Sequence, residues 1–258
     1  VISGEQDAMQ RDDWYTTHRD ARHLDDAAQV GRIAAERSIA RLGGRRVKTG
    51  EFPIILEAPL AGGLLGSLVH AASGGALYRK SSFLLDHLGK KIMPDFVQIA
   101  ERPHIKCGLG SASFDSDGVA TSDRDVVTNG ILQGYFLSTY TARKLGMQTT
   151  ANSGGSHNLI IEPGDLDLEG LMARMGRGLL VTELLGQGIN YVTGDYSRGA
   201  AGFWIEGGRI AYPVEEITIA GNLKDMFAGI VAVGRDVQVR GTKQTGSILL
   251  DRMTVAGE

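Results

Sequence analysis

The chain has 258 residues, a formal net charge of −3, 42% hydrophobic residues and 22% charged residues. These values are typical of a globular protein and exclude a disordered chain, and the slight excess of acidic residues argues against a nucleic-acid binder. No apolar run reaches the roughly 18 residues that a membrane span needs, and no signal peptide is recognisable. Because Cys107 is the only cysteine, we expect a reducing, cytoplasmic compartment, with Cys107 itself as a small buried residue.

The first third of the chain predicts two helices and one strand. The first helix is expected to begin at Asp25 or Asp26, either of which can cap it, and to end at Leu42 before a glycine pair. A short buried strand is expected at residues 52–57. An apolar helix should follow over residues 60–72, after Pro59 in its first turn. Its several glycines are poor helix formers and indicate that another backbone packs close to it.

Strands dominate the rest of the sequence. Helices are predicted at residues 139–145, 166–175 and 223–233, and strands at residues 96–99, 126–138, 158–162, 179–185, 189–193, 203–205, 209–212 and 247–255. Asn129-Gly130 and the Glu-Gly-Gly stretch at residues 206–208 are hairpin signals. Strands joined by tight turns, with few helices between them, indicate an α+β fold built on antiparallel sheet.

No residues close together in the sequence form a recognisable catalytic or metal site. None of the six histidines lies four residues from another, the spacing that places two zinc ligands on one helix face. Ser67 and Ser73 lack the remainder of a nucleophile elbow, and no phosphate-binding glycine motif occurs. Ser156 and His157 are adjacent on an extended segment, so their side chains should point to opposite faces.

One polar cluster stands apart, within residues 194–202. It holds a carboxylate, a phenol, a hydroxyl and a guanidinium from Asp195, Tyr196, Ser197 and Arg198. These groups either line a cleft wall that hydrogen-bonds a peptide, or form an ordinary polar hairpin loop. The Asp-Arg-Asp run at residues 123–125 is a weaker case and reads as a surface run of salt bridges.

Several longer stretches resemble the PmbA/TldD family, and its PmbA branch in particular. They include Thr-Ala-Asn-Ser-Gly-Gly-Ser-His-Asn at 150–158 and Val-Thr-Gly-Asp-Tyr-Ser-Arg-Gly-Ala-Ala-Gly-Phe-Trp at 192–204. The others are residues 134–146, 212–224 and 248–255. Together these stretches cover most of the chain from about residue 50 onward.

The resemblance implies that residues 1–50 are the end of an N-terminal domain with a connecting helix. Residues 51–258 would then form an α+β C-terminal domain, a largely antiparallel, barrel-like sheet with a few packed helices. It also implies a metallopeptidase of two subunits, in which a TldD-type partner carries zinc on a His-Glu-x-x-x-His helix. In the family this pair acts on unfolded peptides, trimming a microcin precursor and degrading an antitoxin. The older family description, modulator of DNA gyrase, does not imply DNA binding.

The zinc motif of the partner can be compared with this chain position by position. The positions that match its first histidine, catalytic glutamate and second histidine are, in order, Gly66, Ser67 and Ala71. His70 is one position out of register. A third ligand, a cysteine, would fall near residue 240, where no cysteine occurs. The resemblance therefore implies no cofactor in this chain and zinc in the partner subunit.

Two other interpretations stay open, and with them the question whether the chain is itself an enzyme. In the first, the chain is a stand-alone hydrolase that uses Asp195, Tyr196 and Arg198 without metal. In the second, the chain is a scaffold that binds peptides without cleaving them. In the leading interpretation, His70 and residues 195–198 are the cleft candidates. A peptide would then add to a sheet edge as an extended strand. A heterodimer with a TldD-type subunit, or a homodimer, is expected, with neither nucleic acid nor membrane as partner.

Overall fold

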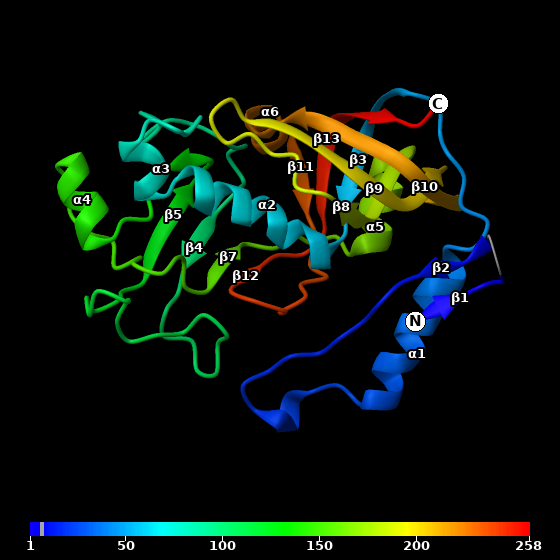
Figure 1. Ribbon diagram of the computed structural model, residues 1–258, viewed down its shortest axis with the longest axis horizontal. Coiled ribbons are helices and arrows are strands. Elements are labelled where there is room, and N and C mark those ends of the chain that lie inside the picture. Colours follow the sequence, from blue (N-terminus) through cyan, green and yellow to red (C-terminus); the bar gives the residue numbers. More distant parts are fainter. Residues whose placement is uncertain (6–7) are drawn as a thin grey trace.

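The computed structural model describes residues 1–5 and 8–258. The N-terminal arm, residues 1–5 and 8–42, lies beside the main body of the molecule (Figure 1). Its elements are β1 (Ile2–Ser3), β2 (Gln10–Arg11), a 3-10 helix (Ala21–His23) and α1 (Ala27–Ala40). The side chain of Asp26 caps α1 by accepting a hydrogen bond from the Gln29 amide, which confirms the predicted helix start.

A closed barrel forms one side of the main body. Its strands are β3 (Gly50–Leu56), β8 (Gly178–Leu185), β9 (Asp195–Glu206), β10 (Arg209–Asn222) and β13 (Ile248–Ala256). They pair in the order β10, β9, β8, β3, β13, and β10 also pairs with β13, which closes the ring. The β3–β8 pair is parallel and the other four pairs of the ring are antiparallel. The predicted α+β class and the barrel-like, largely antiparallel sheet are confirmed.

The remaining elements extend this barrel or build a second sheet beside it. The strands of the second sheet are β12 (Lys243–Gln244), β7 (Leu159–Ile161), β4 (Ile99–Glu101), β5 (Arg124–Thr128) and β6 (Ile131–Leu132), in that order across the sheet. The other elements are α2 (Ala58–Ala71), α3 (Gly74–Tyr78), α4 (Thr139–Leu145), α5 (Leu168–Met175), α6 (Leu223–Ala228) and β11 (Ile230–Val233), which pairs with β13.

Helix α2 joins the two halves of the main body. It runs from the barrel across to the second sheet (Figure 1). Its apolar side chains Leu64, Leu65 and Leu68 belong to one continuous core that also contains Ile54 of the barrel and Ile99 of the second sheet. The barrel and the second sheet therefore share a core, and α2 is held on both sides.

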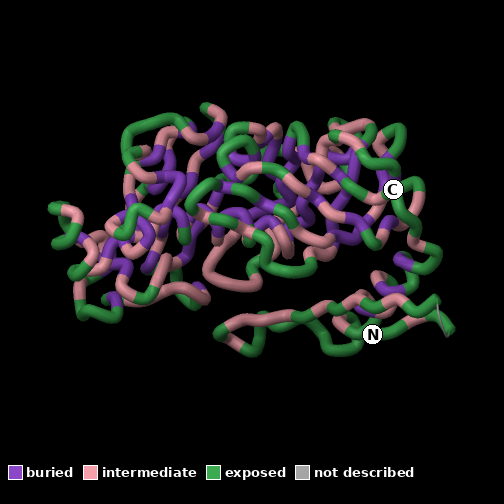
Figure 2. The backbone as a smooth tube through the Cα atoms, turned by 45° about the horizontal axis from the view of Figure 1, so that its top comes forward, coloured by how far each residue is buried: buried purple, intermediate pink, exposed green. Residues whose placement is uncertain are grey.

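The N-terminal arm contributes little to that core. Most of its residues are exposed or half-buried, whereas the buried residues gather in the main body (Figure 2). Ion pairs hold the arm in place: Arg37 donates two hydrogen bonds, of 2.7 and 2.9 Å, to the Glu57 carboxylate, and Arg41 pairs with Glu183. Among the described residues, no helix is both long and apolar enough to cross a membrane.

Several local predictions were wrong. Residues 194–202 are not a loop, since most of them lie within the long strand β9. In place of the strand expected at residues 189–193, Ile189 forms a single bridge with Tyr196 and residues 191–193 are a turn. The helix expected at 223–233 ends at Gly229, where a β-carbon would lie 2.2 Å from the Asp251 carboxylate, and the chain continues as β11. Cys107 is exposed rather than buried.

Candidate functional site

The solvent-facing side of α2 carries three glycines, so no side chains project from much of this surface. Gly63 and His70 are exposed and Gly62 and Gly66 are half-buried, whereas the leucines of the same helix face the core. A β-carbon at Gly63 would meet nothing within 4 Å, and one at Gly66 would meet only the Lys243 side chain, at 3.6 Å. No described part of this chain therefore requires glycine at either position. We name this surface, formed by Gly62, Gly63 and Gly66, the glycine face.

Glycine in a helix interior costs about 1 kcal/mol relative to alanine, so three of them need a reason. The prediction that another backbone packs close to them fails within the chain: the nearest backbone atom is the Lys243 carbonyl oxygen, 3.8 Å from the β-carbon position of Gly62. That distance is an ordinary van der Waals contact and would tolerate alanine. The glycine face thus leaves space for something that is not part of the described chain.

Two cations border this face, and neither forms an ion pair with a described residue. Lys243, on β12, has its ammonium 3.4 Å from the Thr242 hydroxyl and forms no ion pair with a described residue. Arg240 lies over the Trp14 ring at 3.7 Å and the Tyr15 ring at 4.6 Å from their centroids. Burial lowers the pKa of both side chains from their usual values. A cavity of about 320 Å³ is lined by both cations together with Gly62 and Tyr15.

His70 ends the exposed side of α2 and lies against an aromatic ring. Its imidazole stacks on Tyr191, with ring centroids 3.9 Å apart and an angle of 28° between the planes. Tyr191 comes from the turn before β9, and its carbonyl accepts a hydrogen bond from the Phe83 amide. Sequence reasoning missed Tyr191, because the turn that places it beside His70 was predicted as a strand.

The four candidates on β9 do not form one cleft wall. Alternate residues of a strand point to opposite faces, so Tyr196 and Arg198 turn inward whereas Asp195 and Ser197 are exposed. Asp195 accepts hydrogen bonds from the Thr193 hydroxyl at 2.6 Å and from the Asn222 amide at 3.1 Å, which fixes the turn before the strand.

Of the inward pair, burial raises the pKa of Tyr196 above its usual value. The Nε of Arg198 is buried with no hydrogen-bond partner among the described residues. Only its Nη2 donates, to the Leu184 carbonyl at 3.4 Å. The structure thus places Asp195 and Ser197 on the exposed face of β9 and Tyr196 and Arg198 on the inward face. Of the four candidates, only Tyr196 and Arg198 could line a cleft inside the main body.

The side chains at the motif positions of α2 do not fit a zinc ion. Gly66 and Ala71 offer no donor atom, and the hydroxyl of Ser67 donates to the Gly63 carbonyl at 3.2 Å. His70 is a single imidazole, and the ammonium-bearing chain of Lys243 crosses Gly66 where a cation would have to sit. Among residues 1–5 and 8–258, no three His, Cys, Asp or Glu side chains are grouped as metal ligands would be.

The structure nevertheless brings together the two segments that the zinc motif matched. Gly62, one helical turn before Gly66, and Arg240 line the same cavity. In the sequence these segments are far apart, so their meeting is a property of the fold. The helix and the segment near residue 240 are therefore neighbours in the fold.

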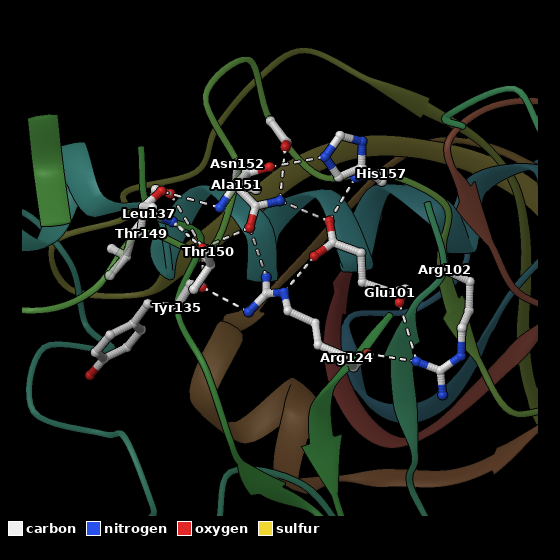
Figure 3. Close-up of polar contacts among 11 residues, drawn as sticks. Glu101, Arg102, Arg124, Tyr135, Leu137, Thr149, Thr150, Ala151, Asn152 and His157 are labelled. Atoms are coloured by element: carbon white, nitrogen blue, oxygen red, sulfur yellow. Dashed lines mark hydrogen bonds and ion pairs between the residues drawn. The ribbon is translucent and has the colours of Figure 1, made fainter. Parts of the chain in front are cut away.

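A buried ion pair lies in the second sheet, between β4 and β5 (Figure 3). The Arg124 Nε donates to the Glu101 carboxylate at 2.6 Å, and the two side chains are 17% and 2% exposed. The other Glu101 oxygen accepts from the Asn152 side-chain amide at 2.9 Å and from the His157 backbone amide at 2.7 Å. The prediction that residues 123–125 are a surface run is therefore wrong for Arg124.

This network gives the stretch at residues 150–158 a structural role. The Thr150 hydroxyl donates to the Asn152 side chain at 2.7 Å, and the His157 ring bonds to the Ala151 carbonyl at 3.0 Å (Figure 3). Thr150, Asn152 and His157 thus bond to the loop and to the Glu101–Arg124 pair, whereas the Ser156 hydroxyl is buried with no hydrogen-bond partner among the described residues. Sequence reasoning missed Glu101, because the strand expected at residues 96–99 in fact spans Ile99–Glu101 and carries this glutamate into the interior.

Comparison with known proteins identifies relatives that are similar in sequence and in fold. Residues 49–257 match the family described as PmbA/TldA metallopeptidase C-terminal domain. The chain is 50% identical over its whole length to Metalloprotease PmbA homolog of Haemophilus influenzae and to Metalloprotease PmbA of Escherichia coli O157:H7, and covers 57% of each. A crystal structure from Bacteroides thetaiotaomicron, named as a candidate modulator of DNA gyrase, superposes with a TM-score of 0.94.

That structure is 33% identical in sequence, and the match covers 99% of this chain and 58% of the other. A TldD homolog of Buchnera aphidicola is a more distant relative. The chain thus spans less than three fifths of the length of the three similar proteins. It belongs to the PmbA/TldD family of metallopeptidases.

Proposed function

We propose that this chain is the part of a PmbA/TldE-type subunit that holds the peptide in a cytoplasmic zinc peptidase of two subunits. A TldD-type partner would supply the zinc and the general base, and unfolded peptides such as microcin precursors and antitoxins would be the substrates. The observation that carries the proposal is the glycine face of α2. The helix that bears the metal in the partner bears, in this chain, three glycines, a bonded serine and an overlying lysine.

The glycine face could lie beneath a bound extended peptide. The edge strand β12 runs beside it, because Lys243 contacts the β-carbon positions of both Gly62 and Gly66. Within the described sheet β12 pairs with β7 on one side only. A peptide that adds to the free edge of β12 gains backbone hydrogen bonds that depend little on its sequence. Glycine beneath it leaves room for side chains of any size.

A bulky residue on the glycine face should block the peptide. We expect Gly63→Phe to lower the rate of peptide cleavage by the chain mixed with its TldD-type partner by roughly tenfold or more, since a misplacement of ~1 Å costs on the order of a hundredfold. The measurement is the rate of release of a labelled fragment from an unfolded peptide. Zinc content of the mixture should not change.

Gly31→Phe is the matched control, because Gly31 lies on α1 and a β-carbon there also meets nothing within 4 Å. It should leave the cleavage rate as it is. Equal cleavage by the Gly63→Phe and Gly31→Phe variants would rule out the glycine face as the surface beneath the peptide.

A further inference from the structure

The cavity at the start of α2 is lined by positively charged side chains and by no acidic side chain of the described chain. It has a volume of about 320 Å³, and Arg240 and Lys243 are its two charged lining residues. None of its described lining residues is acidic. Glu57 and Asp13 act on Arg240 from outside the cavity, and both oxygens of Glu57 accept from Arg37. Neither Lys243 nor Arg240 forms an ion pair with a described residue, so two partly buried cations line one space that contains no acidic side chain of the described chain.

The two cations are held in place rather than free to turn into solvent. Arg240 is packed against the faces of Trp14 and Tyr15, an arrangement that fixes the plane of the guanidinium. The methylene chain of Lys243 lies along α2, with its Cε 3.6 Å from the β-carbon position of Gly66. Desolvated cations without partners cost free energy, and an anion in the cavity would remove that cost.

We propose that this cavity binds a carboxylate of the substrate peptide, with Lys243 and Arg240 as its cationic ligands. The inference rests on the proposed function and deepens it, since the cavity adjoins the glycine face at Gly62. The small volume suits one terminal residue. A peptide on the glycine face would therefore place its C-terminal carboxylate here, and an acidic side chain offers the same chemistry.

Carboxylate binding should depend on pH through Lys243. Burial lowers the pKa of Lys243, so its ammonium loses its proton as pH rises through that lowered pKa. Affinity is then full below this pKa and falls above it. Lys243→Arg keeps the charge at all accessible pH, and its affinity should stay level. This variant keeps Tyr15, Arg37, Glu57 and Asp13, the other charged or titratable groups that act on Arg240.

The test compares three N-acetylated alanine peptides by calorimetry on the purified chain. One has a free C-terminal carboxylate, one is amidated, and one is amidated and contains a glutamate. We expect the free acid to bind roughly tenfold more tightly than the plain amide, as one charge-assisted hydrogen bond would give. Lys243→Gln should remove this preference without weakening the amide, and Lys48→Gln, a change at an exposed lysine, should leave it as it is.

The outcomes separate the two proposals. If the amide and the free acid bind equally, peptide binding stands but the carboxylate site is wrong. If the glutamate peptide equals the free acid, the carboxylate site stands and a side chain is its natural occupant. If neither the acid nor the amide binds, the peptide-holding function falls, and the carboxylate site falls with it. Unchanged unfolding temperatures of the variants show that folding is intact.

Discussion

Glu101→Gln should lower the free energy of unfolding by about 3–5 kcal/mol, the usual cost of removing one partner from a buried ion pair. The carboxylate accepts hydrogen bonds from Arg124, from the Asn152 side chain and from the His157 amide, and all three partners are donors. A glutamine in the same space must point its NH₂ group at one of these donors. The Arg124 charge also stays buried without its partner.

Urea unfolding followed by circular dichroism measures this change as a lower midpoint with an unchanged slope. Asp125→Asn is the matched control, since Asp125 pairs with Arg102 at 2.8 Å but its side chain is 59% exposed. We expect a loss of about 1 kcal/mol or less from this exposed pair. Equal losses from the two variants would contradict the buried role of Glu101.

Gly202→Ala should destabilise the barrel by about 3 kcal/mol, at the upper end of the usual cost of overpacking. Gly202 pairs with Val181 across β9 and β8, and a β-carbon there would lie 1.9 Å from the Leu180 carbonyl oxygen. Backbone atoms of a closed barrel have little room to move apart. The glycine is thus required by the close approach of two strands.

Gly63→Ala makes the matched comparison, because its β-carbon enters open space on a helix. Alanine should raise the free energy of unfolding by about 0.5–1 kcal/mol there. The same substitution is therefore expected to have opposite signs at the two glycines, measured as urea midpoints. A loss of stability at Gly63 would mean that the glycine face is packed rather than open.

Features set by local chemistry could be predicted from the sequence. Asp26 caps α1, and Gly146 ends α4 in the left-handed conformation, with φ of 67°. Asn129 and Gly130 both have positive φ, of 50° and 72°, as their hairpin turn requires. In each case one or two neighbouring residues determine the backbone, so no distant partner was needed.

Features set by distant contacts could not be predicted. The glycines of β9 read as loop residues, yet Gly202 is small because Leu180 crosses beside it. Arg124 reads as a surface charge, yet its partner Glu101 lies on the neighbouring strand and buries it. Lys243 drew no notice because only the fold places it over Gly66. The local pattern of a single sequence carries no direct signal for such pairs.

At the candidate site, one part could be predicted from the sequence and another part could not. Gly66, Ser67 and Ala71 could be set against the zinc motif from the sequence, because the helix was correctly expected there. The cavity that Arg240 and Lys243 share with Gly62 could not, because it joins segments at opposite ends of the domain. The motif positions on α2 thus follow from local sequence, whereas the cavity depends on the fold.

The most direct test is a paired measurement of zinc content and peptidase activity, on the purified chain alone and after mixing with a TldD-type subunit. We predict neither zinc nor cleavage of an unfolded peptide by the chain alone, and cleavage that a zinc chelator abolishes once the partner is added. Stoichiometric zinc in the isolated chain, or cleavage without the partner, would show that the chain has a catalytic site of its own and would contradict the proposed division of labour.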